Sequence, residues 1–275
     1  MNYDEAVQLN VNGSINFMHP LSLATQTAGN DVFYFYQAMQ EDDREDFIKA
    51  MIKEFDDHQS NNHWKLVKRD KIRDAATIKA IWSFQRKCRP DSSLLKHKAR
   101  LCAHGGIQIY RENFWDTYTP VVNWISIRMM LTLSAIHKLY MTSIDFTLAF
   151  PQAEIDVTIY MEVPLGCEVP EVDFVCLLLN NVYGLKQAAR TWFEYLQGSL
   201  IESEGNGGHR FKQSHVDPCI FHKNGIIVII WVDDCLIFSK DKNLADDFIK
   251  SNAATIYTYR RRGYVGISRY PNDIQ

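Results

Sequence analysis

Short apolar runs separated by turn residues mark the last third of the chain. Residues 226–232 and 235–238 are rich in β-branched and aromatic side chains and too short for buried helices, so both runs predict strands. The dipeptide Asn224-Gly225 is typical of a two-residue hairpin turn, and residues 219–222 supply the strand that enters it. The pattern therefore predicts consecutive hairpins of core strands.

Segments with a helical period alternate with further strands in the rest of the chain. Helices are predicted at residues 41–58, at residues 125–140 with a cap near Asn123, and at residues 187–200. Additional strands are predicted at residues 64–67, 80–86, 141–150 and 175–179. Residues 1–30 are polar and lack a period, and we expect the segment 1–40 to be poorly ordered. This order of elements predicts an α+β fold of the split βαβ kind, with helices on one face of a sheet.

Two adjacent carboxylates, Asp233 and Asp234, interrupt the apolar runs at the second predicted turn. Charges in apolar surroundings are costly unless something compensates them, so this pair is a candidate functional site. The pairs 42–43, 56–57 and 246–247 have the same two residues in polar or helical surroundings, where a solvated surface is expected. Only the pair at 233–234 has predicted strands on both sides.

A third carboxylate, Asp145, lies where the predicted strand 141–150 delivers it near its end. If that strand neighbours the hairpin, three carboxylates converge at one edge of the sheet. Carboxylate oxygens suit Mg²⁺, and two such ions support in-line phosphoryl displacement. The residues therefore indicate a metal-dependent nucleotidyl transferase or a nuclease, and they do not choose between the two.

The net charge of −3 over 275 residues conceals an uneven distribution. Residues 1–57 hold 11 acidic side chains, whereas residues 65–111 hold 13 Lys and Arg against three Asp. The basic block suits a polyanion track or a solvated face, and charge alone favours neither. The 6 cysteines lack Cys-x-x-Cys spacing, which predicts reduced thiols, and a zinc site at His215, Cys219 and His222 is disfavoured. No apolar run is long enough to cross a bilayer.

Seven blocks resemble, in order and spacing, the reverse transcriptases of copia-type retrotransposons. They lie at residues 98–105, 119–128, 143–150, 159–166, 182–192, 214–221 and 231–234. The resemblance implies a right-hand polymerase fold, with fingers mainly at 60–130 and 160–184 and the palm mainly at 131–159 and 185–250. Residues 251–275 would begin a truncated primer-grip and thumb connection.

The resemblance also implies roles for individual residues. Asp145, Asp233 and Asp234 would be the catalytic carboxylates and, with the carbonyl of Phe146, would hold two Mg²⁺ or Mn²⁺ ions. The incoming nucleotide would be bound by Lys98, Arg100, Phe150, Tyr183, Gly184 and Lys186. In this set Arg100 matches the triphosphate contact and Phe150 the bulky residue that excludes a ribose 2′-hydroxyl. The primer and template would be contacted by Trp231, Val232, Tyr264 and Gly266.

The implied activity is that of an RNA-directed DNA polymerase domain within a copia-type retrotransposon polyprotein. Its partners would be an RNA or DNA template–primer duplex, deoxynucleoside triphosphates and further domains of the same polyprotein, such as RNase H and integrase. A membrane partner is not expected. The expected location is intracellular and cytoplasmic, inside a virus-like particle where the element is intact.

Two departures from the family pattern support an alternative. Trp231 stands where the family usually has Tyr, and its larger indole is expected to press on the primer end. Ala189 replaces the usual Pro, which is expected to loosen the entry to a helix. The alternative is an impaired retroelement remnant that binds nucleic acid without polymerising. A two-metal nuclease is a third hypothesis, but it leaves the fingers-type blocks without a use.

Overall fold

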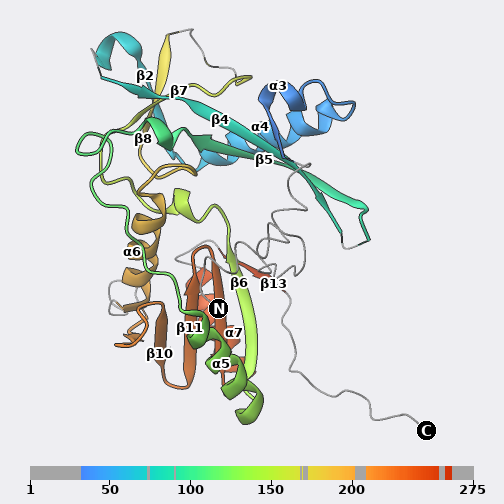
Figure 1. The fold of residues 1–275 in the computed structure, drawn as a ribbon, viewed down its shortest axis with the longest axis vertical. Helices are drawn as coiled ribbons and strands as arrows, with labels where there is room; N and C mark the ends of the chain where they lie inside the picture. Colours follow the sequence, from blue (N-terminus) through green and yellow to red (C-terminus); the bar gives the residue numbers. More distant parts are fainter. Residues whose placement is uncertain are drawn as a thin grey trace, which may run out of the picture. The chain divides into compact units, whose positions relative to one another are not determined.

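The computed structural model describes residues 32–72, 75–89, 91–167, 169, 173–201, 209–253 and 258–261 (Figure 1). The chain divides into two compact units. Unit 1 comprises Met1–Glu54 and Ile81–Arg100, and unit 2 comprises Phe55–Ala80 and Leu101–Gln275. Helices and sheets occur in a mixed α+β arrangement, which confirms the predicted class. No helix among the described residues has the length and apolar character needed to span a membrane.

Unit 1 contains a three-stranded sheet in the order β1-β4-β5. These strands are β1 (Val32–Tyr34), β4 (Ala80–Cys88) and β5 (Leu94–Ala103), and the short helix α3 (Phe35–Ala38) follows β1. The helix α4 (Arg44–Ser60) begins in this unit and matches the helix predicted at residues 41–58. Its Phe47 is fully buried and packs edge-on against Phe84 of β4, with ring centroids 5.6 Å apart. An apolar stripe of α4 therefore anchors the helix in the core of unit 1.

The Arg86 side chain links the start of α4 to β4. Its Nε and Nη2 donate to Asp43 at 2.7 and 2.6 Å, and Nη2 also donates to Glu41 at 2.7 Å. The guanidinium lies 4.6 Å from the ring centroid of Phe33, and His97 contacts Asp43 at 2.6 Å. These contacts hold the pKa of Asp43 well below its usual range, with the Arg86 hydrogen bonds as the largest cause. The expectation that Asp43 merely faces solvent is therefore wrong, because it forms an ion-pair network within unit 1.

The largest sheet of unit 2 has six strands in the order β13-β6-β12-β11-β10-β9. The strands are β6 (Tyr140–Phe146), β9 (Lys212–Gln213), β10 (Ile220–Lys223), β11 (Ile226–Trp231), β12 (Asp234–Ser239) and β13 (Thr258–Arg261). Every neighbouring pair is antiparallel. Asn224 and Gly225 have φ values of 45° and 85°, as a two-residue hairpin turn requires. The two consecutive core hairpins predicted from the sequence are therefore confirmed.

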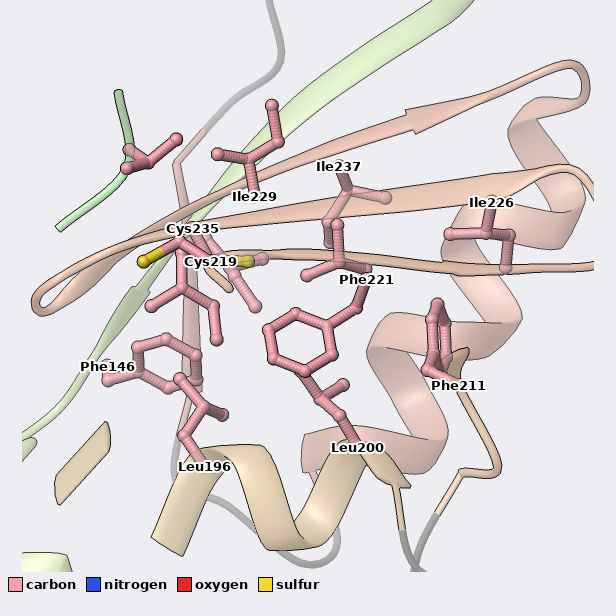
Figure 2. Close-up of a cluster of buried hydrophobic side chains, with 14 of the residues drawn as sticks. Phe146, Leu196, Leu200, Phe211, Cys219, Phe221, Ile226, Ile229, Cys235 and Ile237 are labelled. Atoms are coloured by element: carbon pink, nitrogen blue, oxygen red, sulfur yellow. The ribbon is translucent and has the colours of Figure 1, made fainter. Parts of the chain in front are cut away.

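Helices α6 (Ala188–Ile201) and α7 (Lys242–Ala253) supply the core beneath this sheet. Figure 2 shows Leu196 and Leu200 of α6 directed at the strands, where Phe146 and Phe221 meet them. All four of these side chains are at most 4% exposed. The helix predicted at residues 187–200 is confirmed, and its apolar period is what packs it on the sheet.

The helix α5 (Trp124–His137) begins at the predicted cap, where the Asn123 side chain accepts from the Ile125 amide. It ends three residues before the predicted end, because Tyr140 already belongs to β6. The helix is only partly buried. Ile127 and Met130 join the core, whereas Ile125 and Ile136 are 73% and 66% exposed.

A second sheet of unit 2 has the order β2-β8-β7-β3. Its strands are β2 (Trp64–Lys68), β3 (Thr77–Ile78), β7 (Tyr160–Glu162) and β8 (Phe174–Leu178), and only β3 and β7 run parallel. In the 3₁₀ turn η1 (Arg69–Ile72), Arg69 pairs with Glu162 and with Asp173. Arg69 and Arg86 of the basic block are thus engaged in ion pairs within the protein.

Several elements differ from the sequence predictions. The strand predicted at residues 141–150 ends at Phe146, and Phe150 begins the 3₁₀ turn η3 (Phe150–Gln152). Leu148 has a φ of 49°, which is incompatible with a continuing strand. Strand β5 was not predicted, and residues 32–38 form β1 and α3 rather than a poorly ordered segment. The rest of that segment, residues 1–31, lies outside the described residues.

Candidate active site

Asp145 and Asp234 are direct cross-strand partners in the six-stranded sheet. Opposite residues of an antiparallel pair share a face and have Cβ atoms about 4.5–5.5 Å apart. Asp233 lies in the two-residue turn between β11 and β12, and its carbonyl accepts from the Phe146 amide at 3.3 Å. The structure therefore brings the three predicted carboxylates to one edge of the sheet, as the sequence predicted.

The donor set at this edge suits a hard divalent cation. The predicted ligands are the three carboxylates and the carbonyl of Phe146, and oxygen ligands of this kind are preferred by Mg²⁺. Among the described residues, no three His, Cys, Asp or Glu side chains are grouped closely enough to hold a metal ion. The oxygen chemistry of these side chains fits the ion, and ligation requires the carboxylates of Asp145, Asp233 and Asp234 to turn toward a common centre.

The turn that carries Asp233 has an unusual backbone. Val232 occupies the first turn position with a φ of 55°, where two-residue turns favour glycine and β-branched residues are rare. The indole Nε1 of Trp192, a residue of α6 that is 1% exposed, donates to the Val232 carbonyl at 2.9 Å. The acidic turn is therefore fixed to the helix that underlies the sheet.

Trp231, at the end of β11, packs against the N-terminal residue of α5. The ring centroids of Trp231 and Trp124 are 5.2 Å apart, at an interplanar angle of 57°. Trp231 also contacts the buried core cluster and is partly covered. The indole that departs from the family pattern thus has a packing partner within the chain.

Phe150 and Tyr183, two predicted nucleotide-binding residues, are neighbours, with ring centroids 5.0 Å apart. The Tyr183 carbonyl accepts from the Ala103 amide at 2.7 Å. Gly184 has a φ of 89°, and a Cβ added there would lie 2.2 Å from the Ala103 carbonyl oxygen. Only glycine lets the Tyr183–Gly184 segment approach the end of β5 this closely, so Gly184 has a structural reason for its identity.

Lys186 is held by its own loop and by a neighbouring one. Its Nζ donates to the Gln108 carbonyl at 3.2 Å and lies 4.6 Å from the ring centroid of Phe114. Its amide donates to the Gln108 side chain at 2.8 Å, and Gln108 donates to buried Gln187 at 2.9 Å. The ammonium group of this predicted nucleotide-binding residue is thus engaged in contacts that shape the loop.

Lys98 and Arg100 lie on β5 in unit 1, whereas the three carboxylates lie in unit 2. With Ser83, Gln85 and Lys87 they line an open polar pocket on the β4–β5 pair. Burial, and next the positive charge of Arg100, lower the pKa of Lys98 to about 8. A concentration of positive charge of this kind is suited to a polyanionic ligand.

Asp217 has a central structural role that the sequence analysis did not assign. Its carboxylate is 4% exposed and accepts from the Asn123 amide at 3.0 Å, the Ser126 hydroxyl at 2.7 Å and the Cys219 amide at 3.0 Å. It therefore ties the N-terminus of α5 to the start of β10. The sequence signal that could have identified it is Asp217-Pro218 within the family-like block 214–221, since Asp readily caps nearby amides.

Two of the predicted primer and template contacts, Tyr264 and Gly266, lie outside the described residues.

Comparison with known proteins defines the class. The chain belongs to the reverse transcriptase (RNA-dependent DNA polymerase) family, whose model matches residues 61–267. It is 34% identical over 214 residues to the retrovirus-related Pol polyprotein from transposon TNT 1-94 of Nicotiana tabacum, covering 76% of this chain and 16% of the relative.

Two further relatives support the same family. The chain is 31% identical over 226 residues to the Pol polyprotein from transposon RE2 of Arabidopsis thaliana, covering 80% of the chain and 15% of the relative. It is 28% identical over 208 residues to the truncated transposon Ty1-A Gag-Pol polyprotein of Saccharomyces cerevisiae, covering 73% and 16%. The resemblance to copia-type reverse transcriptases is thus confirmed, and the chain spans about a sixth of the length of these relatives.

Proposed function

We propose that the chain is the fingers and palm part of an RNA-directed DNA polymerase that acts within a retrotransposon Pol polyprotein. The observation that carries the proposal is the register of β6 and β12, which pairs Asp145 with Asp234 beside the turn that holds Asp233. Family membership over residues 61–267 supports the same activity. The palm corresponds to the six-stranded sheet with α5, α6 and α7.

The carboxylates are proposed as the metal-binding and catalytic groups of nucleotidyl transfer. Two Mg²⁺ or Mn²⁺ ions, when bound, supply activation of the primer 3′-hydroxyl and stabilisation of the leaving oxygen. Asp145 and Asp233 are the expected direct ligands, with the Phe146 carbonyl, and Asp234 lies opposite Asp145. The rigid sheet fixes the positions of these groups, which is the main contribution that a protein makes to phosphoryl transfer.

Nucleotide selection is proposed to involve Phe150, the loop with Tyr183, Gly184 and Lys186, and, in unit 1, Lys98 and Arg100. The contact between Phe150 and Tyr183 supports a joint wall against the sugar, where Phe150 would exclude a ribose 2′-hydroxyl. Lys98 and Arg100 are proposed to contact the triphosphate through the basic pocket on β5. Lys186 is proposed to act indirectly, by holding the Tyr183–Gly184 loop through Gln108.

The proposed partners are a template–primer duplex, deoxynucleoside triphosphates and other parts of the same polyprotein. The relatives are all named as Pol or Gag-Pol polyproteins, which supports the last of these partners. RNase H and integrase regions remain the expected companions. Trp231 and Val232 are proposed to lie at the primer end.

Primer extension tests the proposal directly. The protein is incubated with oligo(dT) on poly(rA), thymidine triphosphate and Mg²⁺ or Mn²⁺, and Asp233→Asn is expected to abolish extension. Asp247→Asn is the matched control. It changes one residue of the Asp-Asp pair at 246–247, and the Asp247 side chain is 78% exposed. Undiminished extension by Asp233→Asn overturns the site. Salt-sensitive duplex binding by the unaltered protein without extension under either metal would instead identify a binding remnant.

A further inference from the structure

The indole of Trp192 contacts the turn that carries Asp233 and the strand β6 that carries Asp145. It approaches the hairpin through its hydrogen bond to the Val232 carbonyl, which precedes Asp233. It approaches β6 through the ring of Phe146, with centroids 5.0 Å apart and a near-perpendicular angle of 69°. Phe146 directly follows Asp145, and its amide in turn donates to the Asp233 carbonyl. One buried side chain is therefore adjacent to each of the two backbone segments that present carboxylates.

The hydrogen bond from Trp192 restrains the strained backbone of Val232. Val232 adopts a φ of 55° in the turn, a conformation that is costly for a β-branched residue and persists only where surrounding contacts enforce it. Trp192 is almost fully buried, so its N–H needs an acceptor inside the protein, and the Val232 carbonyl supplies it. The same hydrogen bond therefore restrains the Val232 backbone and satisfies the buried N–H of Trp192.

We propose that Trp192 is a positioning residue for catalysis. Its hydrogen bond to the Val232 carbonyl fixes the position of the Val232–Asp233 turn relative to Asp145. The inference rests on the proposed function of these carboxylates. Loss of the N–H donor would release the turn and let Asp233 move relative to Asp145. Displacements near 1 Å are sufficient to cost about 100-fold in rate when the groups must align with a substrate. Packing of the ring alone would not fix the turn in this way.

An isosteric replacement separates the hydrogen bond from the packing. Substitution of Trp192 by β-(3-benzothienyl)alanine keeps the two-ring shape and replaces the N–H with sulfur. The same replacement at Trp82 is the matched control, because Trp82 is a tryptophan of unit 1 that is 2% exposed. Single-nucleotide incorporation is measured over a range of Mg²⁺ concentrations, together with the Kd for the duplex and the Tm of each protein.

The replacement at position 192 is expected to lower kcat by about tenfold or more and to raise the Mg²⁺ concentration for half-maximal activity. The Kd for the duplex and the Tm should match those of the control replacement at position 82. Equal kcat and equal metal dependence in the two replacements overturn the inference. Asp233→Asn is assayed in parallel, since activity in that variant would refute the proposed catalytic carboxylates, whereas its inactivity together with a fully active Trp192 replacement refutes only the positioning role.

Discussion

The indole rings of Trp124 and Trp231 form a contact between the start of α5 and the strand that leads into the acidic turn, with centroids 5.2 Å apart. Trp231 is the most conspicuous departure from the family pattern, where a smaller tyrosine is usual. Its partner is itself a bulky aromatic residue that is 46% exposed. The indole of Trp231 thus has an aromatic packing partner within the chain.

The Trp124–Trp231 contact is expected to give a measurable coupling energy. Tilted aromatic pairs contribute about 0.5–1.5 kcal/mol beyond area burial, and the partial exposure of Trp124 favours the lower end. The coupling energy is measured by a double-mutant cycle, with urea denaturation of Trp124→Ala, Trp231→Ala and the double variant. Additive destabilisation in the cycle would show that the rings do not support each other.

The substitution Trp231→Tyr is expected to change primer extension by less than about twofold. A tenfold gain in extension with tyrosine would show that the indole at position 231 impairs activity.

Divalent metal is expected to stabilise the fold through the carboxylates. A ligand that binds only the folded state at ten times its Kd stabilises by about 1.4 kcal/mol. Mn²⁺ should therefore raise the Tm of the unaltered protein and have little effect on Asp145→Asn or Asp233→Asn. Calorimetry with and without Mn²⁺ measures the shift, and Asp247→Asn serves as the surface control. A shift of equal size in all four proteins would place the metal elsewhere.

Lys98 should make triphosphate binding dependent on pH. Its pKa is lowered to about 8, chiefly by burial and next by Arg100, and a bound polyanion raises it again. Affinity is therefore greatest below about pH 8 and falls as pH rises, by about tenfold between pH 7 and pH 9. Titration calorimetry with inorganic triphosphate measures this fall. Lys98→Arg stays charged throughout and should bind equally at both values, so a parallel fall in that variant would assign the dependence to another group.

The sequence predicted the acidic edge well because local signals determine it. Asn224-Gly225 specifies a hairpin by its conformational preference, and the apolar runs around Asp233 specify strands by composition. The positive φ of Val232 was beyond such reasoning, since a β-branched residue disfavours it and only the tertiary bond from Trp192 explains it. At the Val232–Asp233 turn, the tertiary contact with Trp192 therefore outweighs the local backbone preference of valine.

Tertiary contacts also explain the other differences. Apolar residues occur on both the buried and the exposed sides of α5, so periodicity did not reveal that Ile125 and Ile136 face outward. The acidic residue Asp43 was expected at a solvated surface because its partner Arg86 lies 43 residues away in the sequence. Asp217 likewise joins segments more than 90 residues apart. Spacing along the chain does not identify such partners without an assigned fold.

Asp217 is expected to contribute strongly to stability. Its buried carboxylate accepts from Asn123, Ser126 and Cys219, so its loss leaves several buried donors without an acceptor. Asp217→Ala should destabilise by about 3 kcal/mol, whereas Ser126→Ala, which removes one donor, should cost about 1 kcal/mol. Urea denaturation gives both values. Equal and small effects would mean that α5 is held by its apolar face rather than by this carboxylate.

The buried pair His58 and His63 should make the stability fall in mild acid. Their Nδ1 atoms are 3.0 Å apart, and burial, with the charge of His58 as the second cause, lowers the pKa of His63 to about 4. The unfolded chain binds a proton at about pH 6.5, which the folded protein resists until about pH 4. Stability is therefore fully present above about pH 6.5 and is progressively lost as pH falls toward 4.

The expected loss is about 2 kcal/mol between pH 7.5 and pH 5.0, from a pKa difference of about 2.5 between the folded and unfolded states. Urea unfolding at the two pH values measures it, with His63→Gln as the test variant. That variant starts less stable but should lose about 2 kcal/mol less on acidification than the unaltered protein. His222→Gln changes an exposed histidine and should retain the full loss. If His63→Gln loses as much stability in acid as the unaltered protein, the loss arises from proton uptake at another group.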